Sequence, residues 1–410
     1  MSRILWVSPY AIHDTSSGAA LFALTLLKLL KRVNNRNFEV QSLSAFVFDN
    51  LRGSSKFDNF AQLQNGKEES FSFEADGITF HYTKTQSTND FDMNLEEQNR
   101  FYEKYLEILY TFKPDFIFGY GGDMLSSTVF DKARLLGIPS AYFLCNGNHK
   151  GYTFPGFSCV LTDSKATANY YKENYGINVI PFGILIDREL VLAKEKKGQY
   201  ITFINPVLSK GLSFFVKIAL IFKEKYPEIR FLVVASRGTL DATISHLKVY
   251  DKKSKTYSTP YNLSMFSNVD VAEHTPNIAL AYEQTRVLLA PALGYESWGR
   301  VATEATFNHI PVLASTQGGL QEAVAGAGVN LEIKKEYLED YLLVPDDKEI
   351  KPWVENLYKL YKDAESWKEK CDEAIETNDM LKSLQRFVNI IDPFLNLHAG
   401  DKITKEKVKK

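Results

Sequence analysis

Short apolar runs alternate with longer amphipathic stretches along most of the chain. Ile4–Val7 is such a run, and the stretch over 19–31 that follows it carries leucines at helical spacing. Val287–Ala290 and Ile310–Ala314 are similar runs, and a helical pattern ending at Asn308 lies between them. Short apolar runs bounded by loop residues predict buried strands, and apolar residues three or four positions apart predict helices. The repeated order of strand, loop and helix predicts parallel sheets covered by helices.

This order occurs in two successive sets. The predicted strands of the first set are Ile4–Val7, Val40–Phe48, Pro114–Phe118, Ile138–Leu144, Val160–Ser164 and the closing run Val179–Ile184. A charged linker over 194–199 leads to the second set, whose first strands are Tyr200–Asn205, Phe231–Ala235 and Asn268–Ala272. We therefore expect an α/β protein with one Rossmann-like domain over 1–183 and another over 184–380.

Several segments fall outside the alternation. Asp49–Ser70 is polar and irregular and is predicted to be a mobile loop, whereas Phe71–Tyr82 is predicted to be a β-hairpin. Lys248–Ser264 is predicted to be an exposed loop, because it is polar and has no period. Near the C-terminus, Leu342–Val344 is predicted to be a short strand and Trp353–Thr377 a long amphipathic helix.

The loop after Val287–Ala290 carries candidate chemistry. Glu296 lies just before the predicted helix, and Glu304 lies two turns inside it. Gly299 and Arg300 lie where a helix presents backbone N–H groups without intrahelical partners, and such groups attract phosphate. An anion cradle between two hydrogen-bond acceptors suits a ligand that is part diphosphate and part polyol.

The run YESWGRVATEA, followed by IPV and GG-x-x-E, resembles the signature of retaining glycosyltransferases of the GT-B fold, family 4, the group 1 type. The resemblance implies that Glu296 contacts the donor sugar and that Glu304 binds the ribose of the nucleotide. It also implies a donor-binding loop made of Ser297, Trp298, Gly299, Arg300 and Val301, whose backbone N–H groups hold the distal phosphate. The alternative interpretation is that the two glutamates are solvated carboxylates at a helix end.

The resemblance also implies the overall architecture. In the GT-B fold, two Rossmann-like domains face one another across a cleft, and a last helix, here over 381–398, crosses back to the first domain. The remaining residues, 399–410, form a basic tail that is expected to be disordered. This tail could touch an anionic membrane surface weakly, although a solvated tail is the favoured interpretation.

Two further positions of the second domain are candidates for donor binding. Lys210 lies at a strand-to-helix turn, where an ammonium beside a helix N-terminus suits a phosphate; the alternative is a solvated surface lysine. The family keeps an Arg five residues before this Lys, but Asn205 stands at that position here, and Arg300 or Arg237 could compensate. His274 opens a loop that reads the nucleotide base in the family.

The first domain offers less specific candidates. Gly18 lies at the start of the first helix, where the family has a glycine beside the donor diphosphate; a tight turn is the alternative. G-x-G-x-x-G is absent, so dinucleotide binding is not indicated. The family commonly has a His after GIP that contacts the donor sugar. That position falls near Asn146, so either Asn146 makes the contact or His149 reaches it from three residues further on.

Composition narrows the class of protein. The chain has 410 residues, of which 45% are apolar and 24% charged, as in folded globular proteins. Its net charge of −2 gives no field that favours nucleic acid. The three cysteines, Cys145, Cys159 and Cys371, lack metal-type spacing and indicate a reducing compartment. Because no segment is long enough to span a membrane, a cytoplasmic location is expected.

The sequence therefore predicts an enzyme that transfers a hexosyl or other glycosyl group from a nucleotide-diphosphate sugar, a UDP-sugar in preference to a GDP-sugar, with retention of anomeric configuration. Lys210 and the helix N-terminus would stabilise the leaving diphosphate. No Asp-x-Asp signal indicates a metal, no cofactor is expected, and the resemblance implies that no metal is needed. The acceptor is open among saccharides, lipid-linked glycans, proteins and small molecules, and so are the donor sugar, the base and the oligomeric state.

Three alternatives remain at this point. The chain could be a catalytically silent partner that binds a nucleotide-sugar and supports an active transferase, because the family Arg is missing at Asn205. It could be another GT-B enzyme, such as a phosphorylase or an epimerase. An unrelated Rossmann-type enzyme is the third, and the absence of G-x-G-x-x-G counts against it.

Overall fold

The computed structural model describes residues 1–33, 36–89, 92–149, 154–236 and 238–400, and the side chains of these residues as far as Leu395. Arg237 and the predicted basic tail from 401 onwards lie outside the described residues. The chain forms two compact units. The first unit comprises Met1–Asp163, Ala168–Leu185 and the chain from Met380 onwards, and the second comprises Ser164–Thr167 and Ile186–Asp379. Each is described by itself.

The first unit is built on an eight-stranded sheet with the order β3-β4-β2-β1-β5-β6-β7-β8. Only the edge strand β3 is antiparallel to its neighbour, and the other pairs are parallel. From β1 the sheet continues through β2 to the hairpin of β4 and β3 on one side, and through β5 to β8 on the other, so the order reverses between β1 and β5. The strands are β1 Ser2–Val7, β2 Phe38–Ala45, β3 Ser70–Ala75, β4 Ile78–Thr83, β5 Phe116–Gly119, β6 Ser140–Phe143, β7 Cys159–Thr162 and β8 Ile180–Pro181.

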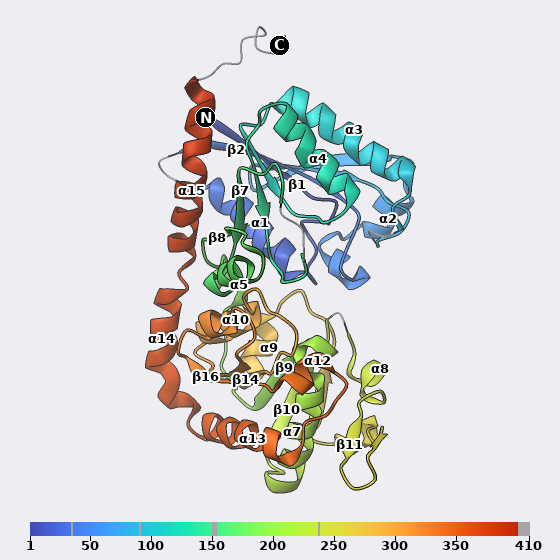
Figure 1. The fold of residues 1–410 in the computed structure, drawn as a ribbon, viewed down its shortest axis with the longest axis vertical. Helices are drawn as coiled ribbons and strands as arrows, with labels where there is room; N and C mark the ends of the chain where they lie inside the picture. The colour runs from blue at the N-terminus through green and yellow to red at the C-terminus, as the bar shows by residue number, and fades with distance from the viewer. Residues whose placement is uncertain (34–35, 90–91, 150–153, 237, 401–410) are drawn as a thin grey trace. The chain divides into compact units, whose positions relative to one another are not determined.

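Helices cover both faces of this sheet (Figure 1). Leu5, Val7 and Ile117 face a core shared with α3 and α4, whereas the alternate residues Trp6 and Phe118 face the opposite side. There Phe118 packs against Phe387 of α15, with ring centroids 5.7 Å apart. The helical segments of this unit are α1 Gly18–Leu30, η1 Leu51–Lys56, α2 Phe60–Asn65, α3 Leu95–Phe112, α4 Met124–Leu135, α5 Lys165–Tyr175, whose first residues group with the second unit, and α15 Met380–Gly400.

The C-terminal helix α15, Met380–Gly400, belongs to the first unit. Phe387 also contacts Phe182, with centroids 5.3 Å apart, and Arg386 Nε donates a hydrogen bond to the Phe182 backbone carbonyl at 2.8 Å. A helix from the far end of the chain thus closes an apolar face of the first sheet.

The second unit is built on a six-stranded sheet with the order β13-β10-β9-β14-β15-β16, in which every pair is parallel. Here chain order reverses between β9 and β14. Open α/β sheets bind ligands beyond the carboxyl ends of their strands at such a reversal. The strands are β9 Tyr200–Ile204, β10 Arg230–Val234, β13 Val269–Ala272, β14 Thr285–Ala290, β15 Val312–Ser315 and β16 Gly328–Leu331.

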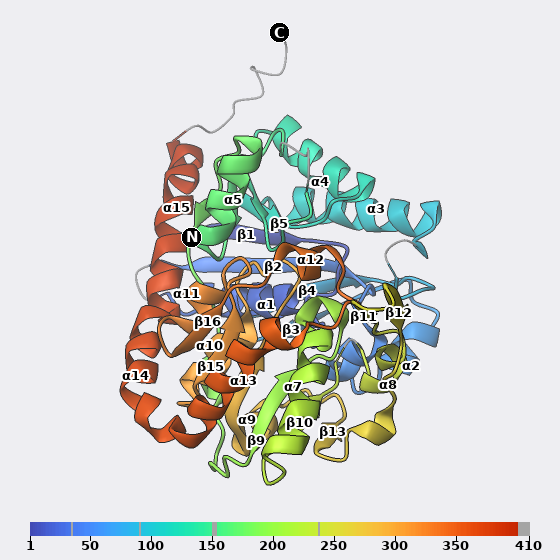
Figure 2. The same cartoon turned by 60° about the horizontal axis from the view of Figure 1, so that its bottom comes forward.

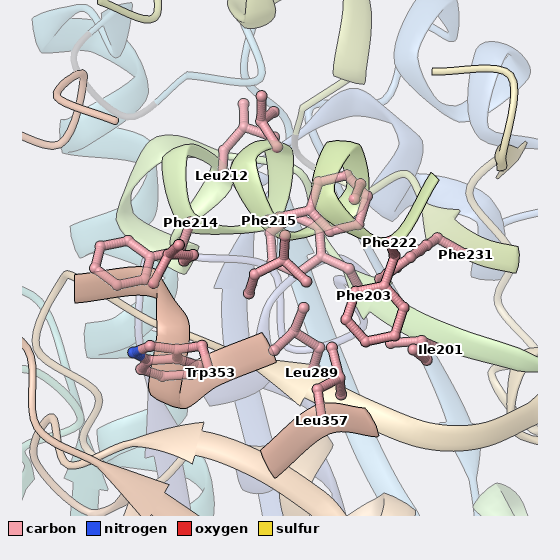
Figure 3. Close-up of a cluster of buried hydrophobic side chains, with 14 of the residues drawn as sticks. Ile201, Phe203, Leu212, Phe214, Phe215, Phe222, Phe231, Leu289, Trp353 and Leu357 are labelled. Atoms are coloured by element: carbon pink, nitrogen blue, oxygen red, sulfur yellow. The ribbon is translucent and has the colours of Figure 1, made fainter. Parts of the chain in front are cut away.

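The core of the second unit lies mainly on one face of this sheet (Figure 3). Phe231 and Val233 of β10 point into this core, whereas Leu232 and Val234 point to the opposite face, as the alternation of a strand requires. Trp353 packs edge-on against Phe214 at 5.5 Å. The helical segments are α6 Arg188–Val191, η3 Leu208–Lys210, α7 Leu212–Lys225, α8 Leu240–Ile244, η4 Leu263–Met265, α9 Ala279–Gln284, α10 Arg300–Phe307, α11 Leu320–Val324, α12 Lys335–Glu339, α13 Asp347–Lys362, η5 Ala364–Trp367 and α14 Lys368–Thr377.

Two predicted loops contain regular structure. Within Lys248–Ser264, β11 (Val249–Asp251) and β12 (Thr256–Ser258) form an antiparallel hairpin. Tyr250 and Tyr257 pair across it with ring centroids 5.1 Å apart. The lysines between them make the segment polar, so this cross-strand contact was not evident from the sequence. Figure 2 shows this hairpin beside α8. Asp49–Ser70 contains η1 and α2 rather than a continuous loop.

The C-terminal predictions were partly wrong. The helix predicted over Trp353–Thr377 is two helices, α13 and α14, separated by the short η5. The helix α13 begins at Asp347, because the side chain of Asp346 accepts a hydrogen bond from Glu349 N–H and caps it. Leu342–Val344 is not a strand; Leu343 makes an isolated bridge with Lys248. Within the described chain, no helix combines the length and apolar character that crossing a bilayer requires.

Candidate functional site

The topology of the second sheet brings two predicted loops together. Because β9 and β14 are parallel neighbours, the loops that follow them leave the same edge of the sheet. The N–H groups of Leu293 and Gly294 donate hydrogen bonds to Ser209 O at 2.9 and 2.8 Å, which joins the two loops directly. Gly211 has a φ of +89°, and a Cβ there would collide with the carbonyl of Pro291. A glycine therefore allows this close approach.

An ion pair joins the two loops at this edge. Lys210 Nζ donates a hydrogen bond to Glu296 Oε1, although the two residues lie 86 positions apart in sequence. The Glu296 side chain is 14% exposed and that of Lys210 is 33% exposed, so both remain accessible to a ligand. The structure thus brings together the two residues that the sequence singled out for phosphate and sugar contacts.

A third loop fixes the backbone of Glu296. Gly319, which follows β15, donates its N–H to Glu296 O at 2.8 Å. Gly318 has a φ of +58°, and a Cβ there would collide with the same carbonyl oxygen. The two glycines of the GG-x-x-E run therefore allow this loop to pack tightly behind Glu296.

The helix α10 begins beside this ion pair. Its N-cap residue Gly299 is left-handed, with a φ of +97°, and supplies no side-chain cap. The N–H groups of Arg300 and Val301 are in the first turn, where a helix attracts anions. Trp298 is buried and its Nε1–H donates to Thr303 Oγ1 at 2.8 Å. Ser297 is also buried. The side chains of Trp298 and Ser297 support the loop, so the expected contacts with a ligand fall to its backbone.

Glu304 is held from two sides inside α10. Arg300 Nε lies 2.7 Å from Glu304 Oε1, and the hydroxyl of Tyr282, in α9, donates to Glu304 Oε2 at 2.8 Å. Burial, with the neighbouring Glu304 carboxylate, raises the pKa of Tyr282 well above its ordinary value. Because Arg300 contacts Glu304, its guanidinium is already engaged, which weakens the idea that it replaces a missing Arg at Asn205. Sequence reasoning missed Tyr282, because no motif marks α9.

The remaining candidates of the second unit also follow strands of the same sheet. Asn205, directly after β9, has a φ of +69°, and its N–H donates to Val234 O at 2.9 Å. Asn adopts this left-handed conformation more readily than most residues, which gives a backbone reason for Asn at this position. His274 follows β13 and is half-buried. Arg237, the other suggested substitute for the family Arg, lies outside the described residues.

The candidates of the first unit lie in loops after β1 and β6. Tyr142 OH and His149 Nε2 are 3.1 Å apart, and His149 N–H donates to Tyr171 OH at 3.2 Å. Tyr171 OH in turn donates to Asn146 O at 3.0 Å. The hydroxyl of Tyr171 is therefore hydrogen-bonded to the backbone of both His149 and Asn146, the two candidates for the sugar contact. Burial lowers the pKa of His149, so the ring is neutral near pH 7.

Gly18 is the first residue of α1, and neither its backbone nor its packing requires a glycine. Its φ is not left-handed, and a Cβ there would meet no described atom within 4 Å. A tight turn therefore does not explain this glycine, and the open space around it suits the approach of a ligand.

A comparison with protein families identifies the second unit. Residues 198–363 match the family model described as glycosyl transferases group 1. This segment is a group 1 glycosyltransferase domain. The match covers β9 through α13, and so includes Lys210, Glu296 and Glu304. A search of the curated proteins gave no match.

Solved structures resemble the whole chain. Sucrose-phosphate synthase from Thermosynechococcus elongatus is 13% identical with a TM-score of 0.67 and covers 98% of this chain and 100% of its own. The pneumococcal O-GlcNAc transferase GtfA, in complex with UDP and GlcNAc, is 12% identical with a TM-score of 0.66. The match covers 96% of this chain and 99% of GtfA. The catalytic domain of starch synthase IV from Arabidopsis thaliana, bound to ADP and acarbose, is 12% identical with a TM-score of 0.61. The match covers 96% of this chain and 99% of that domain.

These likenesses establish the fold. At such low identity they say nothing of substrate. They extend over both units, and they confirm the predicted GT-B fold of this chain. Within the described residues, no group of three His, Cys, Asp or Glu side chains is arranged to hold a metal ion.

Proposed function

We propose that this chain transfers a glycosyl group from a nucleotide-diphosphate sugar to an acceptor, with retention of anomeric configuration and without a metal ion. The observation that carries the proposal is the convergence of Lys210, Glu296 and the first turn of α10 at the reversal of the second sheet. One cation, one row of backbone donors and one carboxylate match the diphosphate and the sugar of such a donor.

The leaving diphosphate sets the main electrostatic requirement. Negative charge grows on it as the bond to the anomeric carbon breaks, and preorganised donors stabilise that charge. Lys210 and the N–H groups of Arg300 and Val301 supply positive potential of the kind that a metal ion supplies in other enzymes. The donor must compete with Glu296 for Lys210, and the Glu296 carboxylate then becomes available to sugar hydroxyls.

Retention is the second part of the proposal. A retaining glycosidase needs two carboxyl groups flanking the anomeric carbon, and the sequence offers no such pair around the candidate site. The departing phosphate would instead deprotonate the acceptor on the face that it leaves. Asn146 or His149 of the first unit is proposed to contact the donor sugar, and Gly18 to lie beside the diphosphate.

The nucleotide is assigned to the second unit. Glu304 is proposed to bind the ribose, and the loop that begins at His274, after β13, to contact the base. GtfA was solved with UDP and starch synthase IV with ADP, so nucleoside diphosphates are ligands of related folds. We propose a UDP-sugar in preference to a GDP-sugar, and a cytoplasmic location in keeping with the few cysteines.

Thermal-shift measurements with UDP-, GDP- and ADP-sugars test this assignment. A ligand that binds only the folded state raises the melting temperature, and the wild-type chain should respond to at least one UDP-sugar. Lys210→Ala should lose that response. Lys217→Ala, which removes a lysine paired with Asp347 in the same unit, should keep it. Failure of every nucleotide-sugar to shift the wild-type chain would contradict the proposal.

A silent nucleotide-sugar-binding partner is the second candidate function. Asn205 in place of the family Arg favours it, because the described site then has one cation fewer to stabilise the leaving group. Donor hydrolysis or transfer by the purified chain alone separates the two. A chain that binds a nucleotide-sugar but never cleaves it would support the silent partner.

A further inference from the structure

The carboxylate of Glu304 is the most enclosed charge of the candidate site. Its side chain is 6% exposed, whereas that of Glu296 is 14% exposed. A carboxylate that is removed from water needs an opposite charge and hydrogen-bond donors around it.

The two partners of Glu304 differ in kind. Arg300 is four residues away on the same helix and supplies the charge. Tyr282 comes from α9, is 1% exposed, and supplies a hydroxyl donor to the other carboxylate oxygen. A hydrogen bond to an ionised acceptor is stronger than one between neutral groups, so this hydroxyl fixes the orientation of the carboxylate.

We propose that Tyr282 is a positioning residue for the donor nucleotide, whose hydroxyl orients the Glu304 carboxylate so that it accepts hydrogen bonds from both ribose hydroxyls and thereby selects ribonucleoside over deoxyribonucleoside diphosphates. This inference rests on the proposed function, because it takes Glu304 as the ribose ligand.

The acceptor capacity of Glu304 supports the pairing with a diol. A carboxylate has about four acceptor positions, two on each oxygen. Among the described residues, Tyr282 occupies one position on Oε2, and Arg300 Nε lies 2.7 Å from Oε1 as an ion pair. Each oxygen therefore keeps at least one position, which matches the two neighbouring hydroxyls of a ribose.

The position of Tyr282 also links two parts of the nucleotide site. It lies on α9, which follows the loop that begins at His274. The same hydroxyl lies 3.3 Å from Val301 O, in the first turn of α10. One side chain thus connects the helix after the proposed base loop with the helix that carries the proposed ribose and phosphate ligands.

Calorimetric titration of the full chain with UDP and with 2′,3′-dideoxy-UDP tests the proposal. The wild-type chain should prefer UDP by about tenfold or more, the loss expected when a buried acceptor is left without its hydrogen bonds. Tyr282→Phe keeps the ring and should reduce this preference severalfold. Tyr337→Phe is the matched control, since it removes a buried hydroxyl that accepts from Asp346 N–H in the same unit, and should keep the preference.

The ratio of the two affinities separates positioning from a structural role. Loss of packing would weaken both ligands equally and leave the ratio unchanged, and that result for Tyr282→Phe would overturn the inference. Tyr282→His, which keeps a ring donor, should restore part of the preference. If Tyr282→Phe does not fold, the ratio measured for Tyr282→His decides alone: a wild-type ratio overturns the inference, and a ratio between wild type and Glu304→Gln supports it.

Failure of the proposed function gives a different pattern. If the wild-type chain binds none of UDP, GDP and ADP, or binds UDP and its dideoxy form equally, the assignment of Glu304 to ribose is wrong, and the inference falls with it. If Glu304→Gln loses the preference while Tyr282→Phe keeps it, only the role of Tyr282 is wrong.

Discussion

The two units of this chain are built on sheets of similar order but carry different chemistry at the strand ends. In both sheets the strand order reverses beside the first strand, between β1 and β5 and between β9 and β14. At the second reversal the candidate residues are charged and paired, Lys210 with Glu296 and Arg300 with Glu304. The candidates of the first unit, Gly18, Asn146 and His149, are neutral.

This difference separates two kinds of contribution. Interactions with charged groups are worth more than those between neutral groups, and they act where charge changes during the reaction. The second unit should therefore provide most of the transition-state stabilisation. The first unit should provide smaller contacts that orient the sugar and the acceptor. Single substitutions in the two units should consequently differ in size.

Lys210→Ala should cause the largest loss of activity. Removing one preorganised donor from a developing oxyanion lowers turnover by about 10²–10³-fold. We expect a loss of this size in kcat/KM, with an unchanged melting temperature in the absence of ligand, measured with the donor found by thermal shift. Lys217→Ala should have wild-type kinetics. A Lys210→Ala enzyme within threefold of wild type would place the catalytic cation elsewhere.

Glu304→Ala should weaken nucleotide binding by about 1–3 kcal/mol, because ribose hydroxyls lose their acceptor. Calorimetry with UDP measures the change. Glu349→Ala is a suitable control, since Glu349 is also a buried glutamate of the second unit and is paired with Lys334. Equal UDP affinity in Glu304→Ala and wild type would refute the ribose assignment.

Acid should destabilise the first unit through two half-buried histidines, His13 and His81. Burial lowers the pKa of His13 and of His81 to about 4, whereas the unfolded chain protonates histidine near 6.5. The unfolded state therefore binds more protons between these values, so stability is complete above about pH 6.5 and is lost as pH falls towards about 4. After discounting for partial exposure, each histidine contributes about 2 kcal/mol.

Thermal unfolding at about pH 7.5 and about pH 4.5 measures this loss, with His13→Asn as the variant. Replacing a titrating ring by a neutral side chain should reduce the difference between the two melting temperatures. His246→Asn, which changes an exposed histidine of the second unit, is the control. An identical difference in His13→Asn and wild type would show that His13 does not titrate as described.

His149→Ala should have the smallest effect, about tenfold or less in KM for the donor, because it removes a neutral contact. Asn146→Ala should be compared with it, since the larger loss identifies which of the two contacts the sugar. Asn148→Ala, an exposed neighbour in the same loop, should leave KM unchanged. If neither Asn146→Ala nor His149→Ala changes KM, this loop does not contact the donor.

Periodicity and short-range signals were sufficient to predict much of the fold. The strand Ile4–Val7 lies within β1, and β3 and β4 form the hairpin predicted over Phe71–Tyr82, with Asp76 and Gly77 at its turn. The strand β16 was missed, because the run around Gly328 is rich in Ala and Gly and its strand character comes from pairing with β15.

The candidate site was predictable only in part. Glu296, Glu304 and Lys210 carry motif signals, and parallel topology explains why the loops after β9 and β14 meet. Tyr282 carries no such signal, because its role depends on a contact between α9 and α10 that only the folded chain creates. The ion pair of Arg300 with Glu304 could not be predicted to limit the role of Arg300 either. An Arg and a Glu four residues apart on a helix can pair, but their spacing does not say whether the pair is buried.

Proton NMR of the purified chain with UDP-, GDP- and ADP-sugars follows both the cleavage of the donor and the anomeric configuration of the product. We expect that the chain alone cleaves at least one UDP-sugar and that the first product formed has the anomeric configuration of the donor. A product with inverted configuration would contradict the retaining mechanism. Cleavage of none of these donors would contradict the assignment of the chain as an active transferase.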